Sequence, residues 1–238
     1  MIGYHFTEKC LRDGRPIPPV GEWLAHEGPV VPCVSGLHAS EEPFDALHYA
    51  PGPFLHKVEL EGDLVPQGNP PDKWCGRRRR ILASIDATAV LWEFARDRAR
   101  SVLHLWKSPV PDVVRRYLET GDESLRSAAE AAACAAARAA ARADDEAAED
   151  AAWAAARAGA HAAWDAAGAA AWAAAHAAWA AARDAAGVAA WAAAWAAARA
   201  AARADDEAAG AAAWAAAGQT FRAMVERAFA EAAEAAAK

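Results

Sequence analysis

Positive charge is scarce in this chain: 25 Lys and Arg stand against 32 Asp and Glu, which leaves a formal net charge of −7 at pH 7. Neutralising nucleic-acid phosphates requires a surplus of Lys and Arg, so the composition argues against nucleic acid as a partner. Cysteine is sparse too, and no C-x-x-C pair occurs among Cys10, Cys33, Cys75 and Cys134. Such spacing disfavours a disulfide framework or a zinc site, and we predict isolated, reduced thiols.

Signals for membrane insertion and secretion are also missing. No uncharged stretch of the alanine-rich second half reaches the roughly 20 residues that a bilayer requires. Charges at Glu8 and Lys9 interrupt what would be the apolar part of a signal peptide, so we expect a cytoplasmic protein without membrane contact. The histidines before residue 128 include no pair with the helical i,i+4 spacing of a metal site, and we predict no metal and no cofactor.

Proline divides the chain, because all 13 Pro lie at or before Pro111. Turn-forming Gly and Pro punctuate short apolar runs in that part, whereas alanine supplies roughly two thirds of residues 128–217. The composition predicts a small α+β domain at 1–123 and an alanine- and tryptophan-rich helical oligomerisation region at 124–238.

Apolar patterns in the first region predict individual elements. We expect strands at 2–7, 30–34, 55–60 and 80–86. A helix at 41–49 has Ser40 as its cap and Pro43 in its first turn. Further helices are expected at 87–99 and at 112–118, the latter ending at Gly121. The basic run 77–80 is typical of a solvated loop that enters a strand, with phosphate contact as the alternative.

Non-alanine residues of the second region recur every four positions, and successive series begin at 134, 149, 164 and 179. The register therefore slips back once in fifteen residues, which gives a period of 15/4, or 3.75 residues per turn. Since about 3.6 residues make a turn of a straight helix, a partner following this stripe would wrap in a right-handed, coiled-coil-like supercoil. We favour a continuous helix over a fold-back, and ninety residues would extend roughly 135 Å.

Seven tryptophans lie in this region, and we predict that the helix self-associates, because so many exposed indole rings favour burial against a partner. The alternative is a soluble helix without a partner. At the end of the chain, Phe221, Met224, Val225 and Phe229 form an amphipathic face that predicts a packed terminal helix. The predicted assembly interface consists of Trp153, Trp164, Trp172, Trp179, Trp191, Trp195 and Trp214.

Two segments of the first region carry a motif. The sequence Y-H-F-T stands at 4–7, and S-G-L-H-A-S at 35–40 leads into the expected helix. These segments resemble the first two motifs of ADP-ribosyltransferase-like domains. The resemblance implies that His5 and Thr7 hold a nicotinamide ribose, that His38 stands where an aromatic residue is usual, and that Ser40 supplies a small hydroxyl. These four residues are candidates for nucleotide binding.

The catalytic Glu or Gln of that superfamily has no clear match, and Glu59 or Glu61 would have to stand in for it. A carboxylate stabilises the positive charge that develops as nicotinamide leaves. A domain without one can bind a nucleotide without turning it over, so catalytic residues stay unassigned and we favour a protein that is not an enzyme.

Roughly the first 125 residues, with L-R-D-G-R-P-I-P-P at 11–19, also resemble an uncharacterised domain of bacteriophage and bacterial proteins that often carry low-complexity tails. This resemblance implies no activity. Our leading hypothesis is a structural protein that displays a globular head on an Ala/Trp helical rod, which assembles with copies of itself into a bundle or filament. The alternative is an ADP-ribose- or NAD-binding, or ADP-ribosyltransferase-like, head with an oligomerising tail.

Overall fold

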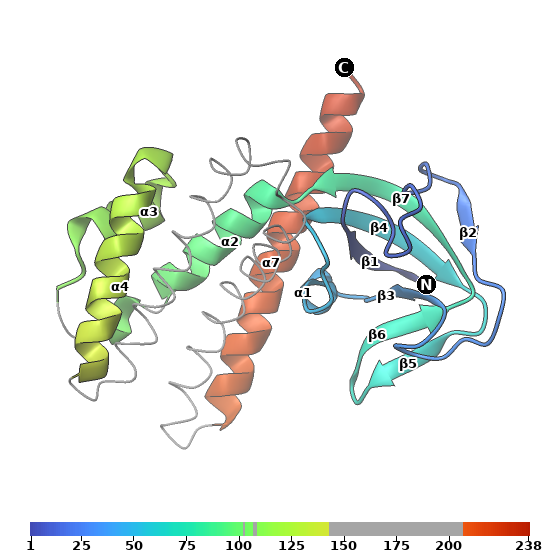
Figure 1. The fold of residues 1–238 in the computed structure, drawn as a ribbon, viewed down its shortest axis with the longest axis horizontal. Coiled ribbons are helices and arrows are strands. Elements are labelled where there is room, and N and C mark those ends of the chain that lie inside the picture. Colours follow the sequence, from blue (N-terminus) through green and yellow to red (C-terminus); the bar gives the residue numbers. More distant parts are fainter. Residues whose placement is uncertain (102, 107–108, 143–206) are drawn as a thin grey trace. The chain divides into compact units, whose positions relative to one another are not determined.

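The computed structural model describes residues 1–101, 103–106, 109–142 and 207–238 (Figure 1). The chain divides into two compact units, Met1–Val90 with Gly218–Lys238, and Leu91–Ala217. We call the first unit the head and the second the helical unit. The compositional boundary at residue 123 falls within the helical unit.

The head contains a four-stranded antiparallel sheet with strand order β1-β4-β7-β2. Its strands are β1 (Ile2–Thr7), β4 (Phe54–Glu61), β7 (Arg78–Asp86) and β2 (Trp23–Ala25). Val58 and Leu60 of β4 are fully buried and form a core with Ala39 and Ile81. Glu59 lies between them in the chain and therefore on the opposite face of the strand.

A second sheet has the order β3-β6-β5, from β3 (Leu37–Ala39), β6 (Pro71–Gly76) and β5 (Val65–Gly68). The end of β3 lies against β1, because the Tyr4 amide donates to the Ser40 carbonyl at 2.7 Å and the Ser40 amide donates to the Tyr4 carbonyl at 3.0 Å. This approach requires glycine at position 3, since a Cβ on Gly3 would lie 2.5 Å from the Ser40 carbonyl oxygen.

Three of the four expected strands are present, and the structure confirms an α+β domain with antiparallel sheets. The strand at 2–7 is β1, and those at 55–60 and 80–86 extend by one or two residues into β4 and β7. The strand expected at 30–34 is wrong: Val31 and Ser35 form an isolated bridge around a turn in which Cys33 has φ 62°. Four strands were not expected from the sequence: β2, β3, β5 and β6. The last two escaped prediction because the Gly and Pro at their ends were interpreted as turns.

The helix α1 (Pro43–Leu47) is shorter than predicted and begins at Pro43, where a missing N–H is harmless. Ser40 is not its cap, since Glu42 occupies that position without a side-chain cap bond. The physical reason is that the Ser40 backbone pairs with Tyr4 and so belongs to the end of β3.

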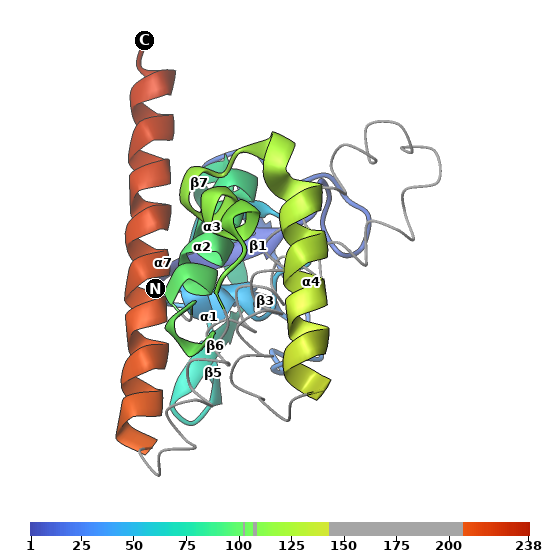
Figure 2. The ribbon, with the colours of Figure 1, turned by 90° about the vertical axis from the view of Figure 1, so that its left-hand side faces the viewer.

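The head also includes the last part of α7 (Glu207–Ala236), an unbroken helix of 30 residues (Figure 2). The predicted amphipathic face packs on the head, where Phe221 and Val225 are 0% exposed. The Phe221 ring lies 6.2 Å from that of Phe44 on α1. The Phe229 ring lies 6.5 Å from that of Tyr4 on β1.

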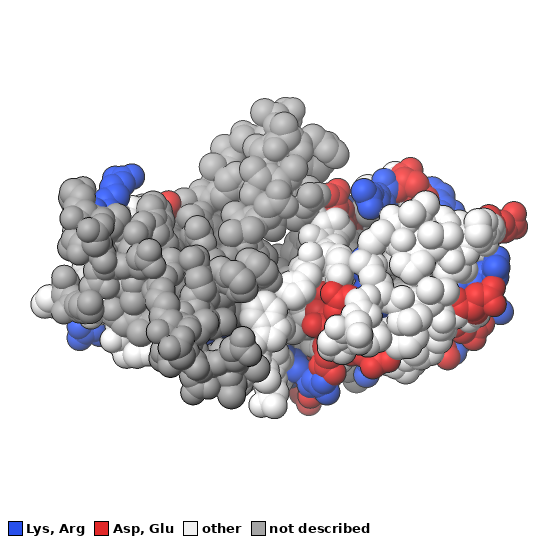
Figure 3. Space-filling view, turned by 90° about the horizontal axis from the view of Figure 1, so that it is seen from below, with Lys and Arg blue, Asp and Glu red and all other residues white. Residues whose placement is uncertain are grey.

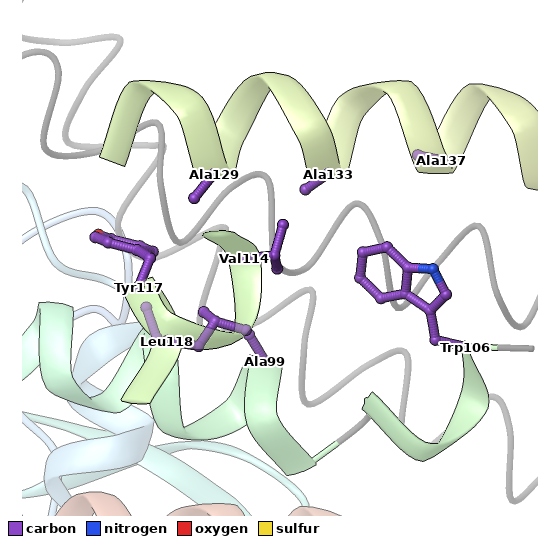
Figure 4. Packing of buried hydrophobic residues seen from close by; sticks show 9 residues of the cluster. Ala99, Trp106, Val114, Tyr117, Leu118, Ala129, Ala133 and Ala137 are labelled. Atoms are coloured by element: carbon purple, nitrogen blue, oxygen red, sulfur yellow. The ribbon is translucent and has the colours of Figure 1, made fainter. Parts of the chain in front are cut away.

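The helical unit contains most of α2 (Thr88–Ser101), then η1 (Leu103–Leu105), α3 (Asp112–Thr120), η2 (Glu123–Leu125) and α4 (Arg126–Arg142). As predicted, α3 ends at Gly121, whose φ of 65° is the left-handed conformation that glycine favours. One face of α4 consists of Ala129, Ala133 and Ala137, each at most 1% exposed. Figure 4 shows this face turned toward Val114, Tyr117 and Leu118 of α3, with Trp106 beside it.

Most of the predicted rod lies outside the described residues. Of the tryptophan stripe, the structure describes Trp214 alone, which is partly exposed on α7. The 3.75-residue period, the right-handed supercoil and the continuous helix therefore stay predictions. None of the described helices is long and apolar enough to cross a bilayer.

Candidate functional site

Strand pairing gathers polar residues on the inner face of the four-stranded sheet. Directly opposite residues of antiparallel strands point to the same face. His5 lies opposite His56, and His56 lies opposite Ser84. Arg79 lies opposite Leu60, which belongs to the buried core, so this is the face that packs inward. We call His5, Thr7 and His56, together with Arg79 and the neighbouring His38 of β3, the inner-face site.

A directional chain of hydrogen bonds holds His56. The Thr7 hydroxyl donates to the Glu8 carbonyl at 2.8 Å, so it accepts from Nε2 of His56, also at 2.8 Å. Nδ1 of His56 then accepts from the Ser84 hydroxyl at 2.7 Å. Burial, followed by the charge of Arg79, lowers the pKa of His56 to about 4, which keeps the ring neutral at pH 7. Nε2 of His56 therefore orients Thr7, while the bond from Ser84 to Nδ1 holds the ring in place.

Arg79 is a buried guanidinium without a carboxylate beside it. The residue is 7% exposed, and its Nη1 donates to the His38 carbonyl at 2.7 Å. Burial lowers its pKa to about 10, so the group stays charged at pH 7, and no acidic residue in the described part of the chain pairs with it. Buried charges in proteins are normally paired, because an unpaired one is costly. The site thus offers a cation that lacks its counter-ion.

The His38 ring adds a second unsatisfied group next to Arg79. Its Nε2 is buried and finds no hydrogen-bond partner among the described residues. Burial, followed by the nearby charges of Lys73, Arg79 and Arg12, lowers the pKa of His38 to about 4. Burial also lowers the pKa of His5 well below its ordinary value, with Arg79 as the next cause. Neutral imidazoles therefore surround a charged guanidinium.

The carboxylates considered for catalysis lie on the opposite face of the sheet. Glu59 pairs with Arg80 at 2.6 Å, and Glu61 pairs with Arg78 at 3.1 Å. Both alternate along β4 with core residues, and successive side chains of a strand point to opposite faces. Neither glutamate can reach a ligand bound beside His5.

The structure brings the four predicted nucleotide-binding residues together. His5 and Thr7 share the inner face of β1, and the pairing of Tyr4 with Ser40 places the end of β3, with His38, alongside.

Sequence reasoning missed Arg79 and His56. The basic run 77–80 is not a solvated loop at position 79, because β7 already begins at Arg78 and strand alternation turns every second side chain inward. Arg78 and Arg80 stay on the outer face, where both stack over Trp23. The run itself carries no signal that distinguishes Arg79, because all four of its residues are arginine.

Metal binding finds no support in the described part of the chain, where no group of three or more His, Cys, Asp or Glu is placed to hold an ion. Acidic and basic side chains are interspersed over the surface of the head seen in Figure 3. That face therefore lacks the single-sign surface that a polyanion would require.

Residues 1–93 match a domain of unknown function, DUF7666. No curated protein and no solved structure matches the chain. The matched range runs from β1 through β7 into α2, so it contains every residue of the inner-face site. It ends before α3, α4 and α7. The inner-face site therefore lies within the matched range and not in the segments that follow it.

Proposed function

We propose that the head binds a small phosphate-bearing anion of the ADP-ribose or NAD class at the inner-face site. The observation that carries the proposal is Arg79, a guanidinium that stays charged inside the head with a single carbonyl as its described hydrogen-bond partner. An anion reaching it would form charge-assisted hydrogen bonds, which are stronger in a low-dielectric interior than in water. The unpartnered Nε2 of His38 supplies a further polar contact.

The choice of a nucleotide among anions rests on Thr7 and on the resemblance of the first two motifs to ADP-ribosyltransferase-like domains. The chain of hydrogen bonds through His56 fixes the Thr7 side chain in one orientation. A preorganised polar group loses little freedom on binding, which favours recognition of a defined sugar or phosphate.

We propose that the head binds the nucleotide without catalysing a reaction of it. The departure of nicotinamide develops positive charge that an enzyme stabilises with a carboxylate. Glu59 and Glu61 face away from the site, and each is engaged with an arginine.

Ligand-dependent stability tests this function on the full chain. A ligand that binds the folded state raises the free energy of unfolding by RT ln(1 + [L]/Kd), about 2.7 kcal/mol at a hundredfold excess over Kd. We expect ADP-ribose and NAD to raise the unfolding temperature, whereas free ribose, the uncharged control, should not. Absence of a shift at millimolar ADP-ribose and NAD would contradict the proposal.

We also propose that the alanine- and tryptophan-rich region assembles with copies of itself. The supporting observation is the alanine face of α4, on which side chains four residues apart are buried completely by close helix packing. Trp106 lies beside that face within the chain (Figure 4). The same combination of small residues and indoles continues in the sequence of the tryptophan stripe.

Light scattering of the full chain tests this second function. We expect a multimer that dissociates when Trp172 and Trp179 are both replaced by alanine. Replacement of Trp23, which lies on β2 of the head, is the matched control and should leave the mass unchanged. A monomeric wild-type chain, or a double variant of unchanged mass, would refute assembly through the stripe.

A further inference from the structure

Lys73 on β6 is a second buried cation of the head. The residue is 8% exposed, although it follows the opposite face of the strand from Trp74, which packs against the core. Its Nζ donates to Sγ of Cys33 at 3.5 Å and lies 3.5 Å from the centroid of the Tyr49 ring. No carboxylate in the described part of the chain forms an ion pair with it. A sulfur acceptor and an aromatic ring compensate a buried charge less well than an anion does.

Strand pairing places His38 beside Lys73. His38 lies opposite Cys75, and Lys73 lies two residues before Cys75, so His38 and Lys73 are diagonal neighbours on one face of the β3-β6-β5 sheet. After burial, the charge of Lys73 is the next cause that lowers the pKa of His38, and the charge of Arg79 follows. Arg79 also holds the His38 carbonyl. Two cations without a described carboxylate partner therefore adjoin one residue, whose buried Nε2 has no described partner either.

We propose that Lys73 and Nε2 of His38 hold a second phosphate group next to the one held by Arg79, so that the ligand of the head is a diphosphate. This inference rests on the proposed binding of a phosphate-bearing anion at the inner-face site. A phosphate oxygen is a much stronger acceptor for an ammonium group than a thiol sulfur, so the ligand replaces the contact of Lys73 with Cys33. With its proton on Nε2, the His38 ring donates to the same phosphate group.

The side of this subsite at Lys73 borders solvent. Cys33 is exposed, and Tyr49 is 41% exposed. Asp72, the acidic neighbour of Lys73 in the chain, accepts from the Tyr49 hydroxyl at 2.6 Å. The carboxylate closest in sequence is thus engaged with a phenol, and the ammonium group is left to an anion from outside the chain.

Inorganic pyrophosphate and inorganic phosphate, at equal ionic strength and without divalent ions, test the second subsite on the full chain. We expect calorimetric titration of the wild type to show tighter binding of pyrophosphate than of phosphate. Lys73→Met should weaken pyrophosphate binding roughly tenfold to a hundredfold, the range for loss of a hydrogen bond to a charged group, and should remove most of the preference for pyrophosphate. Lys57→Met removes an exposed lysine of β4 and is the matched control, which should bind both anions as the wild type does.

An unchanged preference for pyrophosphate in K73M, or no binding of pyrophosphate by the wild type, would overturn the second subsite. The proposed function is judged separately. If ADP-ribose stabilises the wild type and K73M equally, nucleotide binding stands and only this inference is contradicted. If pyrophosphate binds through Lys73 but neither ADP-ribose nor NAD stabilises the chain, the nucleotide is wrong and the diphosphate subsite stands.

A second measurement needs no substitution. Because Lys73 contacts Sγ of the exposed Cys33, pyrophosphate that engages the ammonium group should slow alkylation of this thiol in wild-type chains. Peptide mass spectrometry measures the alkylation rate at Cys33, with Cys134 on α4 as the internal control. Equal rates at Cys33 with and without millimolar pyrophosphate would overturn the inference even if K73M does not fold.

Discussion

Replacement of Arg79 by methionine should separate ligand binding from folding. Burial lowers the pKa of Arg79 from 12.5 to about 10, and one pKa unit corresponds to about 1.4 kcal/mol, so burial disfavours the charged form by about 3 kcal/mol. Methionine has a similar reach and no charge, so R79M removes this penalty. It also removes the hydrogen bond to the His38 carbonyl, which contributes roughly 1–3 kcal/mol. The two effects nearly offset.

We therefore expect R79M to leave the free energy of unfolding of the ligand-free protein within about 2 kcal/mol of wild type and to abolish stabilisation by ADP-ribose. Urea unfolding, followed by tryptophan fluorescence with and without ligand, measures both. R80M is the matched control: Arg80 forms a partly exposed ion pair on the opposite face, worth at most about 1 kcal/mol, and ligand stabilisation should persist.

Two results would refute the reasoning on Arg79. A loss of more than about 4 kcal/mol in ligand-free R79M would show that the guanidinium serves to anchor β3 through His38. Full ADP-ribose stabilisation of R79M would show that the ligand binds elsewhere.

Three further predictions concern stability. The pKa of His56 is about 4 in the folded chain and near 6.5 in the unfolded chain, so the unfolded state binds more protons between these pH values, and the free energy of unfolding falls by up to about 3 kcal/mol as the pH drops through this range. The difference between the urea midpoints at pH 7 and pH 4.5 should therefore be smaller in H56Q than in wild type. An equal difference would exclude His56 as the source. F221A should lower the free energy of unfolding by about 3–5 kcal/mol because the Phe221 ring is fully buried. Replacement of the exposed Glu231 by alanine is the control and should change this free energy little. Equal urea midpoints for the two variants would refute the packing of α7 on the head. A133L should destabilise the helical unit by about 1–3 kcal/mol, because a larger side chain overpacks the buried position of Ala133. Replacement of the exposed Ala135 by leucine is the control, and thermal circular dichroism measures the unfolding temperature of both variants. Equal unfolding temperatures would mean that the alanine face is not close-packed.

The predictable parts of the fold are those in which a local pattern and the tertiary structure agree. Alternation predicted β1, β4 and β7, and Gly121 predicted the end of α3. Such patterns report which face of an element is buried, and that information is local. The strands β5 and β6 escaped prediction because Gly68 and Pro71 lie at their ends, where only pairing with a neighbouring strand distinguishes a strand from a turn.

The site was predictable only in part for the same reason. His5, Thr7, His38 and Ser40 stand in short motifs that can be found along the chain. The burial of Arg79, in contrast, depends on its pairing partner Leu60, which is a relation between strands distant in sequence. A basic residue in a basic run is normally expected to be exposed to solvent, but the position of Arg79 in the sheet buries it.

The packing of α7 on the head has a consequence for synthesis of the chain. The chain emerges from the ribosome at about 5–20 residues per second, so roughly 7–30 s separate the end of β7 from the last turn of α7. Throughout that interval Phe44 and Tyr4 of the nascent head lack the helix that packs on them. A chain that stops before Phe221 leaves this apolar patch exposed, and chaperones that recognise exposed apolar surface can distinguish it from a chain that carries the helix. Synthesis of α7 therefore removes a surface by which an incomplete head can be recognised.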